Sequence, residues 1–207
     1  MITELKNHSI ALHYLSVLRD ERTDISDFRK ATIVLTQALV LEASRQLELS
    51  AESIKTPLEK IEGQKIKGKL VFVPILRAGL GMLDAALDTL PNAAVGYIGL
   101  ERDEQTAIAH CYYSKMPNLS DVQKVFLLDP MLATGGSASQ SIVKLKELGA
   151  KNVSMVSIVA APEGLQHLQE LHPDVDIFTA SIDRELDVNR YILPGLGDFG
   201  DRLFGTN

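Results

Sequence analysis

Runs of consecutive apolar residues alternate with segments of helical spacing through the middle of the chain. Such runs are typical of strands buried on both faces, and strands that alternate with helices indicate a mostly parallel sheet covered on both sides. The predicted strands are residues 69–73, 94–100, 124–128, 153–161 and 175–181, and the predicted helices are 80–90, 137–148 (with Gly149 as C-terminal cap) and 162–171. In such α/β folds ligands bind at the carboxyl ends of the strands, so we look for a site in the residues that follow each strand.

The segment before this pattern is interpreted as helical. Residues 26–47 have dense apolar positions, and Ser26 or Asp27 can cap the start of a helix. We interpret this helix as part of the scaffold or of a subunit interface. The chain of 207 residues is expected to form one domain, divided into an N-terminal helical region, a core sheet and a tail: residues 1–65, 66–181 and 182–207.

Composition excludes several classes of protein. With 45% hydrophobic and 23% charged residues the chain resembles an average globular protein, and its net charge of −6 does not fit a basic nucleic-acid-binding surface. No apolar run approaches the ~18 residues of a membrane span. The first twenty residues lack the features of a signal peptide, and Cys111 alone cannot form an intrachain disulfide. We therefore expect a cytoplasmic protein.

The strongest candidate for chemistry is the segment VFLLDPMLATGGSAS, residues 125–139. A predicted strand ends at Asp129, and a Thr-Gly-Gly-Ser turn (residues 134–137) leads into a helix. Exposed glycine N–H groups, two hydroxyl groups and the positive end of a helix dipole are suited to bind a phosphate, while Asp129 can accept hydrogen bonds from neighbouring hydroxyl groups. This pattern predicts a sugar phosphate site, and an ordinary strand-to-helix turn is the alternative. The segment is not a Walker P-loop, because Gly136 occupies the place of the lysine.

Two arginines follow other predicted strands. Arg77 lies in the turn after the strand 69–73, where the dipole of the next helix disfavours a cation, and its guanidinium can bind a diphosphate through two hydrogen bonds. Arg102 follows the strand 94–100 and lies in a polar segment, residues 101–117, that has no clear period. A long connection in a compact domain is often a mobile lid. A solvated hairpin is the alternative for this segment.

The C-terminal tail is rich in glycine. Glycine costs conformational entropy unless the backbone must approach another group closely, so we interpret the tail as backbone that reads a flat heterocycle through its N–H and C=O groups. The segment GLGDFG, residues 195–200, formally matches a dinucleotide-binding pattern, but no strand leads into it and only DRLFGTN follows, so that interpretation fails. A frayed tail is the alternative, although apolar residues favour docking: Ile192, Leu196, Phe199 and Phe204.

These segments resemble one known family. DPMLATGGS resembles the loop with which type I phosphoribosyltransferases bind phosphoribosyl diphosphate (PRPP). With VPILRAGLGM, VAAPEGL, HPDV, TASID and YILPGLGDFGDRLFGT, the chain resembles the uracil phosphoribosyltransferase family over essentially its whole length. Most type I enzymes have two adjacent acids in this loop, whereas here Pro130 follows Asp129, as in the uracil enzymes. Phe199 stands where many relatives have alanine.

The resemblance implies an α/β fold of the type I phosphoribosyltransferase kind and transfer of a phosphoribosyl group from PRPP to uracil, which gives UMP and diphosphate. The implied PRPP-binding residues are Arg77, Arg102, Asp129, Pro130, Met131, Leu132, Ala133, Thr134, Gly135, Gly136, Ser137 and Asp198. The implied uracil-binding residues are Ile192, Gly197, Asp198 and Phe199. Arg77, Arg102 and Asp198 are the expected catalytic residues. The implied cofactor is Mg²⁺, held mainly by the diphosphate, with Asp198 as a candidate ligand through water.

Other interpretations stay open at this point. One is a phosphoribosyltransferase for another nucleobase, and a second is a regulator of the same fold that binds RNA and senses UMP, which the acidic charge disfavours. A structural α/β domain without a small-molecule site is the third. The resemblance also implies a homodimer or homotetramer. Activation by GTP and ordering of a lid by ligand are left undecided by the sequence.

Overall fold

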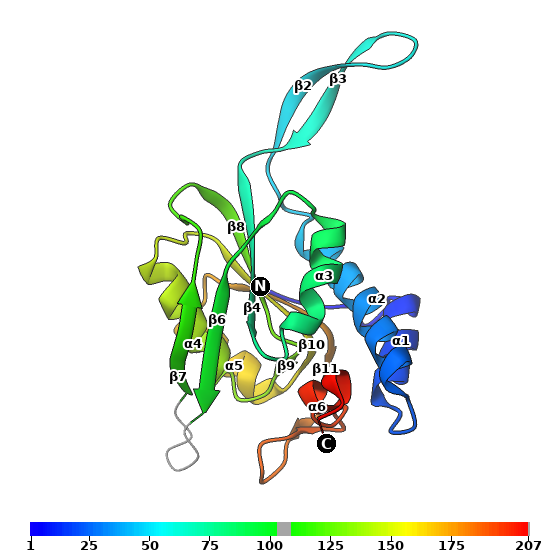
Figure 1. Ribbon diagram of the computed structural model, residues 1–207, viewed down its shortest axis with the longest axis vertical. Helices are drawn as coiled ribbons and strands as arrows, with labels where there is room; N and C mark the ends of the chain where they lie inside the picture. Colours follow the sequence, from blue (N-terminus) through cyan, green and yellow to red (C-terminus); the bar gives the residue numbers. More distant parts are fainter. Residues whose placement is uncertain (103–108, 207) are drawn as a thin grey trace.

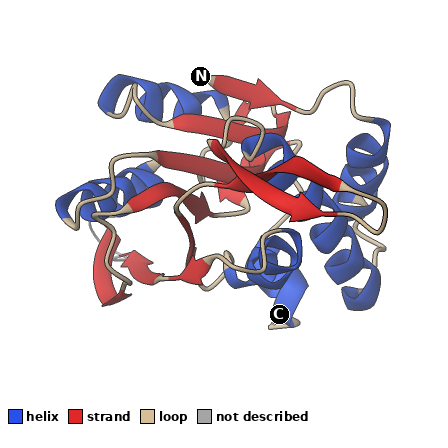
Figure 2. Cartoon of the chain, turned by 90° about the horizontal axis from the view of Figure 1, so that it is seen from above, coloured by secondary structure: helices blue, strands red, loops and turns tan. Residues whose placement is uncertain are grey.

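The computed structural model describes residues 1–102 and 109–206, and at residues 101, 102, 109 and 110 it describes the backbone alone. The chain forms a nine-stranded sheet between two layers of helices (Figures 1 and 2). The strands of this sheet are β1 (Ile2–Glu4), β4 (Lys69–Leu76), β5 (Ala94–Val95), β6 (Tyr97–Arg102), β7 (Ala109–Lys115), β8 (Val122–Leu128), β9 (Met131–Leu132), β10 (Val153–Ala160) and β11 (Asp176–Ile182). The helices are α1 (Ser9–Arg19), α2 (Ile25–Ala43), α3 (Leu80–Thr89), α4 (Gly136–Glu147), α5 (Pro162–Leu171) and α6 (Phe199–Phe204).

The sheet is parallel in every described pair except the last. Its order is β1-β11-β10-β8-β4-β6-β7, with β5 beside β4 and β9 beside β10, and only β6 and β7 pair antiparallel. The central strands are apolar because both of their faces are covered, and every residue of β10 is buried. The prediction of a mostly parallel, doubly covered sheet is confirmed.

Two hydrophobic cores lie on opposite faces of the sheet, because successive strand residues point to opposite sides. On one face Phe72 and Phe126 stack with ring centroids 5.4 Å apart and belong to the core formed with α1, α2 and α3. On the other face Val71 and Leu127 pack in the core formed with α4 and α5. The helix layers thus occupy the two faces, and the carboxyl-end edge of the sheet, lowest in Figure 1, is where the C-terminal tail lies.

The predicted core elements are present, with two differences in β4 and β5–β6. The strand predicted to end before Pro74 runs on to Leu76. Pro74 lies opposite Leu128 of β8. On the other side of β4 it falls between the part that pairs with β5 and the part that pairs with β6, so its missing N–H interrupts neither of those two ladders. The strand predicted over 94–100 is divided into β5 and β6 at Gly96.

The N-terminal region is not helical throughout. Helices α1 and α2 occupy its first part, and Asp24, rather than Ser26 or Asp27, caps α2 by accepting a hydrogen bond from the N–H of Asp27 at 2.8 Å. The prediction of helical structure as far as residue 65 is wrong for two antiparallel strands, β2 (Leu49–Lys55) and β3 (Lys60–Ile66). This hairpin projects from the body of the molecule (Figure 1).

The segment predicted as a lid or a hairpin, residues 101–117, contains the end of β6 and all of β7. Residues 103–108 of this segment lie outside the described residues. The described backbone on either side forms the antiparallel pair of a hairpin. Whether the segment closes over a ligand stays a prediction.

The tail contains a small pair of strands, β12 (Glu185–Leu186) and β13 (Ile192–Leu193), followed by α6. Phe199 and Leu203 of α6 join the core on the α2 face, and Phe199 packs against Phe28 with ring centroids 5.3 Å apart. Phe204, which was also expected to dock, is exposed. The end of the tail is therefore docked against the body, whereas residues 184–191 are largely exposed. Among the described helices none is both long and apolar enough to cross a membrane.

Candidate active site

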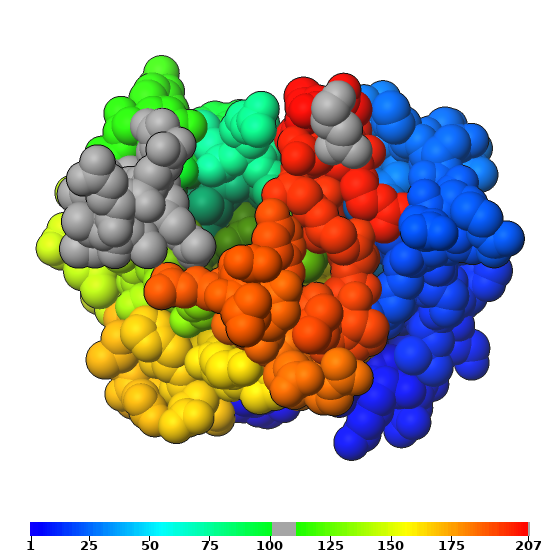
Figure 3. All heavy atoms as spheres, turned by 90° about the horizontal axis from the view of Figure 1, so that it is seen from below, coloured from blue at the N-terminus to red at the C-terminus, as the bar shows by residue number. Residues whose placement is uncertain are grey.

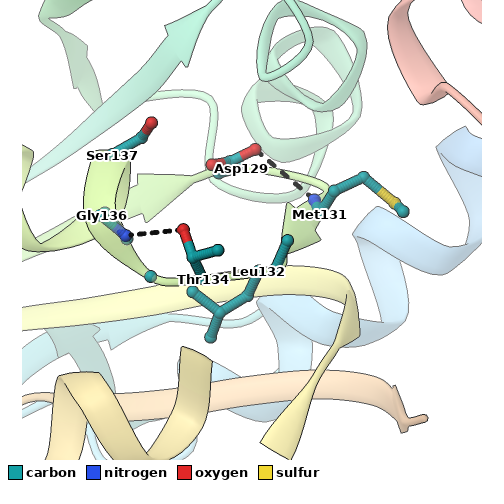
Figure 4. Close-up of a pocket in the computed structure, with 9 residues that line it drawn as sticks. Asp129, Met131, Leu132, Thr134, Gly136 and Ser137 are labelled. Carbon is teal, nitrogen blue, oxygen red and sulfur yellow. Dashed lines mark hydrogen bonds between the residues drawn. The ribbon is translucent and has the colours of Figure 1, made fainter. Parts of the chain in front are cut away.

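The segment between β8 and α4 forms a small cavity at the carboxyl-end edge of the sheet (Figure 4). The cavity has a volume of about 40 Å³, and a single water needs about 10–15 Å³, so it has room for the oxygens of a phosphate. Its lining consists of Asp129, Met131, Leu132, Ala133, Thr134, Gly135, Gly136, Ser137 and Ala138. The structure thus brings together most of the predicted phosphate-binding residues in one place.

The N-terminus of α4 leaves its backbone N–H groups available to a ligand. Gly135 precedes the helix with φ of 80°, a left-handed conformation that favours glycine, and no side chain caps the helix. The N–H of Gly136 is 3.5 Å from the hydroxyl oxygen of Thr134, a long contact. An uncapped helix start with a positive dipole end is an anion-binding arrangement.

Pro130 does not line the cavity, although it was predicted among the PRPP-binding residues. Its side chain is buried, and its carbonyl oxygen accepts hydrogen bonds from the N–H groups of Ile158 and Val159, both at 3.0 Å. The residue therefore fastens the loop to β10.

The loop rests on α5 and on the segment after it. A β-carbon at Gly164 of α5 would stand 2.4 Å from the carbonyl oxygen of Ala133, so only glycine allows this approach. On α4, the buried hydroxyl of Ser139 lies 2.9 Å from Nε2 of His172, which is also buried. These contacts fix the loop and the first turn of α4 relative to each other.

Asp129 is a half-buried carboxyl group at the carboxyl end of β8. Burial raises its pKa to about 7, partly opposed by a long hydrogen bond of 3.5 Å from the N–H of Met131. None of the ion pairs among the described residues includes it. Its position beside an anion cup suits a carboxylate that accepts hydrogen bonds from sugar hydroxyl groups.

Arg77 lies at the end of β4, next in the sheet to β8. It is exposed and lines an open depression of about 280 Å³ with Leu76, Leu100 and Tyr112. The turn after β4 packs closely on β8, because a β-carbon at Gly79 would stand 2.4 Å from the carbonyl oxygen of Leu128. Arg77 thus follows the strand beside the one that carries Asp129, although it does not line the phosphate cavity.

Arg102 is described by its backbone alone. It is the last residue of β6 and pairs with Ala109 of β7, and its side chain lies outside the described part of the structure. Its predicted contact with diphosphate stays a prediction.

The tail lies across the same edge of the sheet, and the surface is hollowed beside it (Figure 3, orange to red). Of the residues predicted to bind uracil, Ile192 and Phe199 have buried side chains, whereas Gly197, with φ of 83°, and Asp198 are exposed. Asp198 also caps α6, because its Oδ1 accepts a hydrogen bond from the N–H of Asp201 at 2.9 Å. The cavity at the phosphate loop includes none of these tail residues.

Sequence reasoning did not assign roles to three residues that support these segments. His172 contacts α4, and Arg19 and Asp183 form an ion pair at 2.5 Å beside the tail. His172 and Asp183 lie in the motifs HPDV and TASID, which contribute to the family resemblance but do not show which partners these two residues have. Within the described residues, no group of three or more His, Cys, Asp or Glu side chains is arranged to hold a metal ion.

Comparisons with known proteins identify the family of the chain. The model of the family described as "Uracil phosphoribosyltransferase" matches residues 5–206. The chain is 48% identical to the uracil phosphoribosyltransferase of Fervidobacterium nodosum over 97% of each chain, and 49% identical to that of Streptococcus salivarius over 97% of this chain and 96% of the relative.

Solved structures give the same result for the fold. The AQ2163 protein of Aquifex aeolicus superposes with a TM-score of 0.94 over 100% of this chain and 99% of its own, at 38% identity. The adenine phosphoribosyltransferase of Thermoanaerobacter pseudethanolicus is 14% identical and superposes with a TM-score of 0.52 over 75% of this chain and 83% of its own, a likeness of fold alone. With nearly its whole length matched in sequence and all of it in structure, the chain belongs to the uracil phosphoribosyltransferase family.

Proposed function

We propose that the protein transfers the phosphoribosyl group of PRPP to uracil and releases UMP and diphosphate. The observation that carries this proposal is the cavity between β8 and α4, where an uncapped helix N-terminus lies beside the carboxyl group of Asp129. In a member of this family, that pair of features suits a ribose 5-phosphate: the helix N–H groups bind the phosphate and Asp129 binds ribose hydroxyls.

The leaving diphosphate is bound from the other side of the ribose. We assign Arg77 to this role because its exposed guanidinium, at the end of the strand next to β8, can donate two hydrogen bonds to a diphosphate, and we assign Arg102 to the same role from the family resemblance.

Mg²⁺ fits the donor set of this site as a metal held mainly by the substrate. Mg²⁺ commonly binds substrate phosphates with only one or two carboxylates from the protein, and the exposed Asp198 can supply such a group through water. When bound with the diphosphate, Mg²⁺ supplies positive charge that stabilises the leaving group.

The tail is proposed to read uracil through its main chain, from Ile192 and from Gly197 to Phe199. Backbone N–H and C=O groups with fixed directions discriminate between bases, because cytosine exchanges donors for acceptors and leaves buried groups without partners. A site of this kind can discriminate by ~10⁴ or more.

The reaction develops positive charge at the anomeric carbon as the bond to diphosphate breaks. We propose that the residues act mainly by positioning the two substrates and stabilising the departing negative charge. Uracil loses its N1 proton in the reaction, and Asp198 is the tail carboxylate proposed to accept it.

The proposal is tested by measuring UMP formation from uracil and PRPP, with and without Mg²⁺, with cytosine, thymine and hypoxanthine in parallel. UMP formation that depends on Mg²⁺ and occurs with uracil alone supports the proposal. Product with another base reassigns the substrate. No product, with or without GTP, from a folded sample that still binds PRPP or UMP favours a regulator and overturns an enzymatic function, whereas product only with GTP identifies an enzyme that needs an activator.

The resemblance also implies an assembly of several chains, and it leaves activation by GTP to be measured. We propose a homodimer or homotetramer, in which exposed apolar side chains of α2 such as Ile33 and Leu41 are buried. Light scattering of the purified protein measures the assembly. The assay with and without GTP tests activation by that nucleotide.

A further inference from the structure

Gly195 is held through both of its backbone groups. It lies between Ile192 and Gly197, two residues of the proposed uracil site. Its N–H donates to Oδ2 of Asp183 at 2.8 Å, and its carbonyl oxygen accepts from Nη1 of Arg19 at 2.9 Å. The two peptide groups that flank Gly195 therefore have their directions set by side chains from outside the turn.

Arg19 and Asp183 are themselves joined in a two-point ion pair. Nη1 of Arg19 donates to Oδ2 of Asp183 at 2.8 Å, and Nη2 donates to Oδ1 at 2.5 Å. The hydroxyl of Ser181 donates to Oδ1 at 2.9 Å and accepts from Nη2 at 3.1 Å. Burial raises the pKa of Asp183, but the bonds from Arg19, Gly195 and Ser181 outweigh it, and its pKa lies below the ordinary value. Asp183 is thus a buried carboxylate with four donors around it.

A second arginine holds the next peptide group. Arg202 of α6 donates to the carbonyl oxygen of Leu196 at 2.7 Å. It also donates to two carbonyl oxygens at the end of α1, that of Leu18 and that of Asp20, the latter at 2.6 Å. Its guanidinium lies 4.5 Å from the ring centroid of Phe28. Three consecutive peptide groups directly before Gly197 are therefore fixed to the C-terminal end of α1, where Arg19 is the last helical residue.

A stabilising role alone does not explain this arrangement well. A buried ion pair is weak support for stability, because the loss of hydration offsets much of the attraction between the charges. The turn itself is tight, since a β-carbon at Gly195 would stand 2.1 Å from the carbonyl oxygen of Ile192, so only glycine fits there. What the pair adds is direction: it fixes which way the N–H and C=O of Gly195 point.

We propose that Arg19 and Asp183 are positioning residues for recognition of the base. By fixing the peptide groups on either side of Gly195, they set the directions of the main-chain groups from Gly197 to Phe199 that meet uracil. The inference rests on the proposed function and adds residues of α1 and of the segment after β11 to the base site, although neither side chain belongs to the proposed set that touches uracil.

The test compares substrate dependence in variants that keep the chain folded. Arg19→Lys keeps the positive charge but cannot reach Gly195 and both oxygens of Asp183 in one plane. Asp183→Asn keeps an acceptor for the N–H of Gly195 and loses the charge. For both we expect KM for uracil to rise about tenfold or more, the scale of a lost charge-assisted hydrogen bond, while KM for PRPP stays within about twofold.

Arg22→Lys is the matched control. Arg22 makes a similar two-point pair with Asp20, at 3.0 and 2.7 Å, but its side chain is exposed and touches none of the tail residues named above. Its KM values for both substrates should match those of the unaltered protein. PRPP binding by calorimetry and thermal unfolding, measured on every variant, show whether the phosphate half of the site and the fold are intact.

The outcomes separate the inference from the proposed function. A rise in KM for uracil alone supports the positioning role. Unchanged KM values in Arg19→Lys overturn it, because base recognition then does not depend on the ion pair. An equal rise in KM for uracil and for PRPP also overturns it, because the ion pair then supports the whole fold and not the base site. If the unaltered protein forms no UMP, the proposed function fails before any variant is compared, and the inference falls with it.

Discussion

Gly164 of α5 lies against the carbonyl group of Ala133 in the phosphate loop, so closely that a β-carbon at position 164 would stand 2.4 Å from the carbonyl oxygen. Helix α5 therefore supports the loop by direct contact between backbones. Gly164→Ala should displace the loop, lower PRPP affinity about tenfold and destabilise the fold by about 1–3 kcal/mol through overpacking. This loss opposes the gain of about 1 kcal/mol that alanine brings inside a helix. Calorimetry with PRPP and urea unfolding measure the two effects.

Gly63→Ala is the control for that substitution. A β-carbon at Gly63 would meet only the flexible side chain of Ile54, in the hairpin that projects from the body. PRPP affinity should be unchanged. Equal PRPP affinity in Gly164→Ala and the unaltered protein would show that the loop does not depend on α5.

The parallel core could be predicted from sequence because its signals are local. Apolar runs mark strands that are buried on both faces, and Gly149 marks the end of α4. There the N–H of Gly149 donates to the carbonyl oxygen of Lys146, and the N–H of Ala150 donates to the carbonyl oxygen of Leu145, both at 3.0 Å. Gly149 has a φ of 97°, as is common in a glycine that ends a helix. Such features need no knowledge of distant residues.

The β2–β3 hairpin was missed because neither of its strands has a buried face, and only a buried face gives a strand a recognisable apolar pattern. Most of its residues are exposed, so the apolar and polar alternation of a half-buried strand is absent. The remaining signal is its turn, in which the hydroxyl of Thr56 accepts hydrogen bonds from the N–H groups of Leu58 and Glu59. A turn alone does not distinguish a hairpin from a loop between helices.

The phosphate loop was predictable and the support of the tail was not. The loop is a continuous segment, and its glycines, hydroxyls and acid can be recognised together. Arg19 and Asp183 are 164 positions apart, and no local pattern relates them. Their contact depends on how α1 packs against β11, which is a property of the folded chain.

The carboxyl group of Asp129 predicts a pH dependence of PRPP binding. With a pKa of about 7, the folded protein carries it largely protonated at pH 6 and largely ionised at pH 8. The carboxylate offers an acceptor at both oxygens and its charge strengthens both hydrogen bonds, so PRPP affinity should rise about tenfold from pH 6 to pH 8 on account of this group. Calorimetry across this range measures the rise. The titration of the substrate phosphates affects the unaltered protein and Asp129→Asn equally, so the part of the rise that comes from Asp129 should be absent in Asp129→Asn.

The same group predicts a change in stability of the opposite sense. Its pKa is higher in the folded state than in the unfolded state, so its contribution is favourable at low pH and is lost as pH rises from about 4 through 7. The free energy of unfolding of Asp129→Asn relative to the unaltered protein should therefore increase from pH 5 to pH 8. A constant difference in urea unfolding over this range would contradict the raised pKa.

His172 predicts a loss of stability on acidification. Burial and the nearby Lys146 lower its pKa, so the neutral imidazole that pairs with Ser139 is favoured in the folded state. A lowered pKa gives stability that is present above the unfolded value of about 6.5 and is lost as pH falls below it. Urea unfolding between pH 7.5 and pH 5 should show a steeper loss of the free energy of unfolding for the unaltered protein than for His172→Gln.

Asp198 combines a structural and a proposed chemical role that two substitutions separate. Asparagine caps a helix as well as aspartate does, so Asp198→Asn should keep the bond to Asp201 and the unfolding midpoint but lower kcat. Asp198→Ala should lose both, with about 1 kcal/mol of stability from the missing cap. Asp24→Ala, which removes the similar cap of α2, is the control: it should lose comparable stability and keep kcat. Full turnover in a folded Asp198→Asn would remove this carboxylate from the reaction and leave main-chain positioning as the source of catalysis at the base.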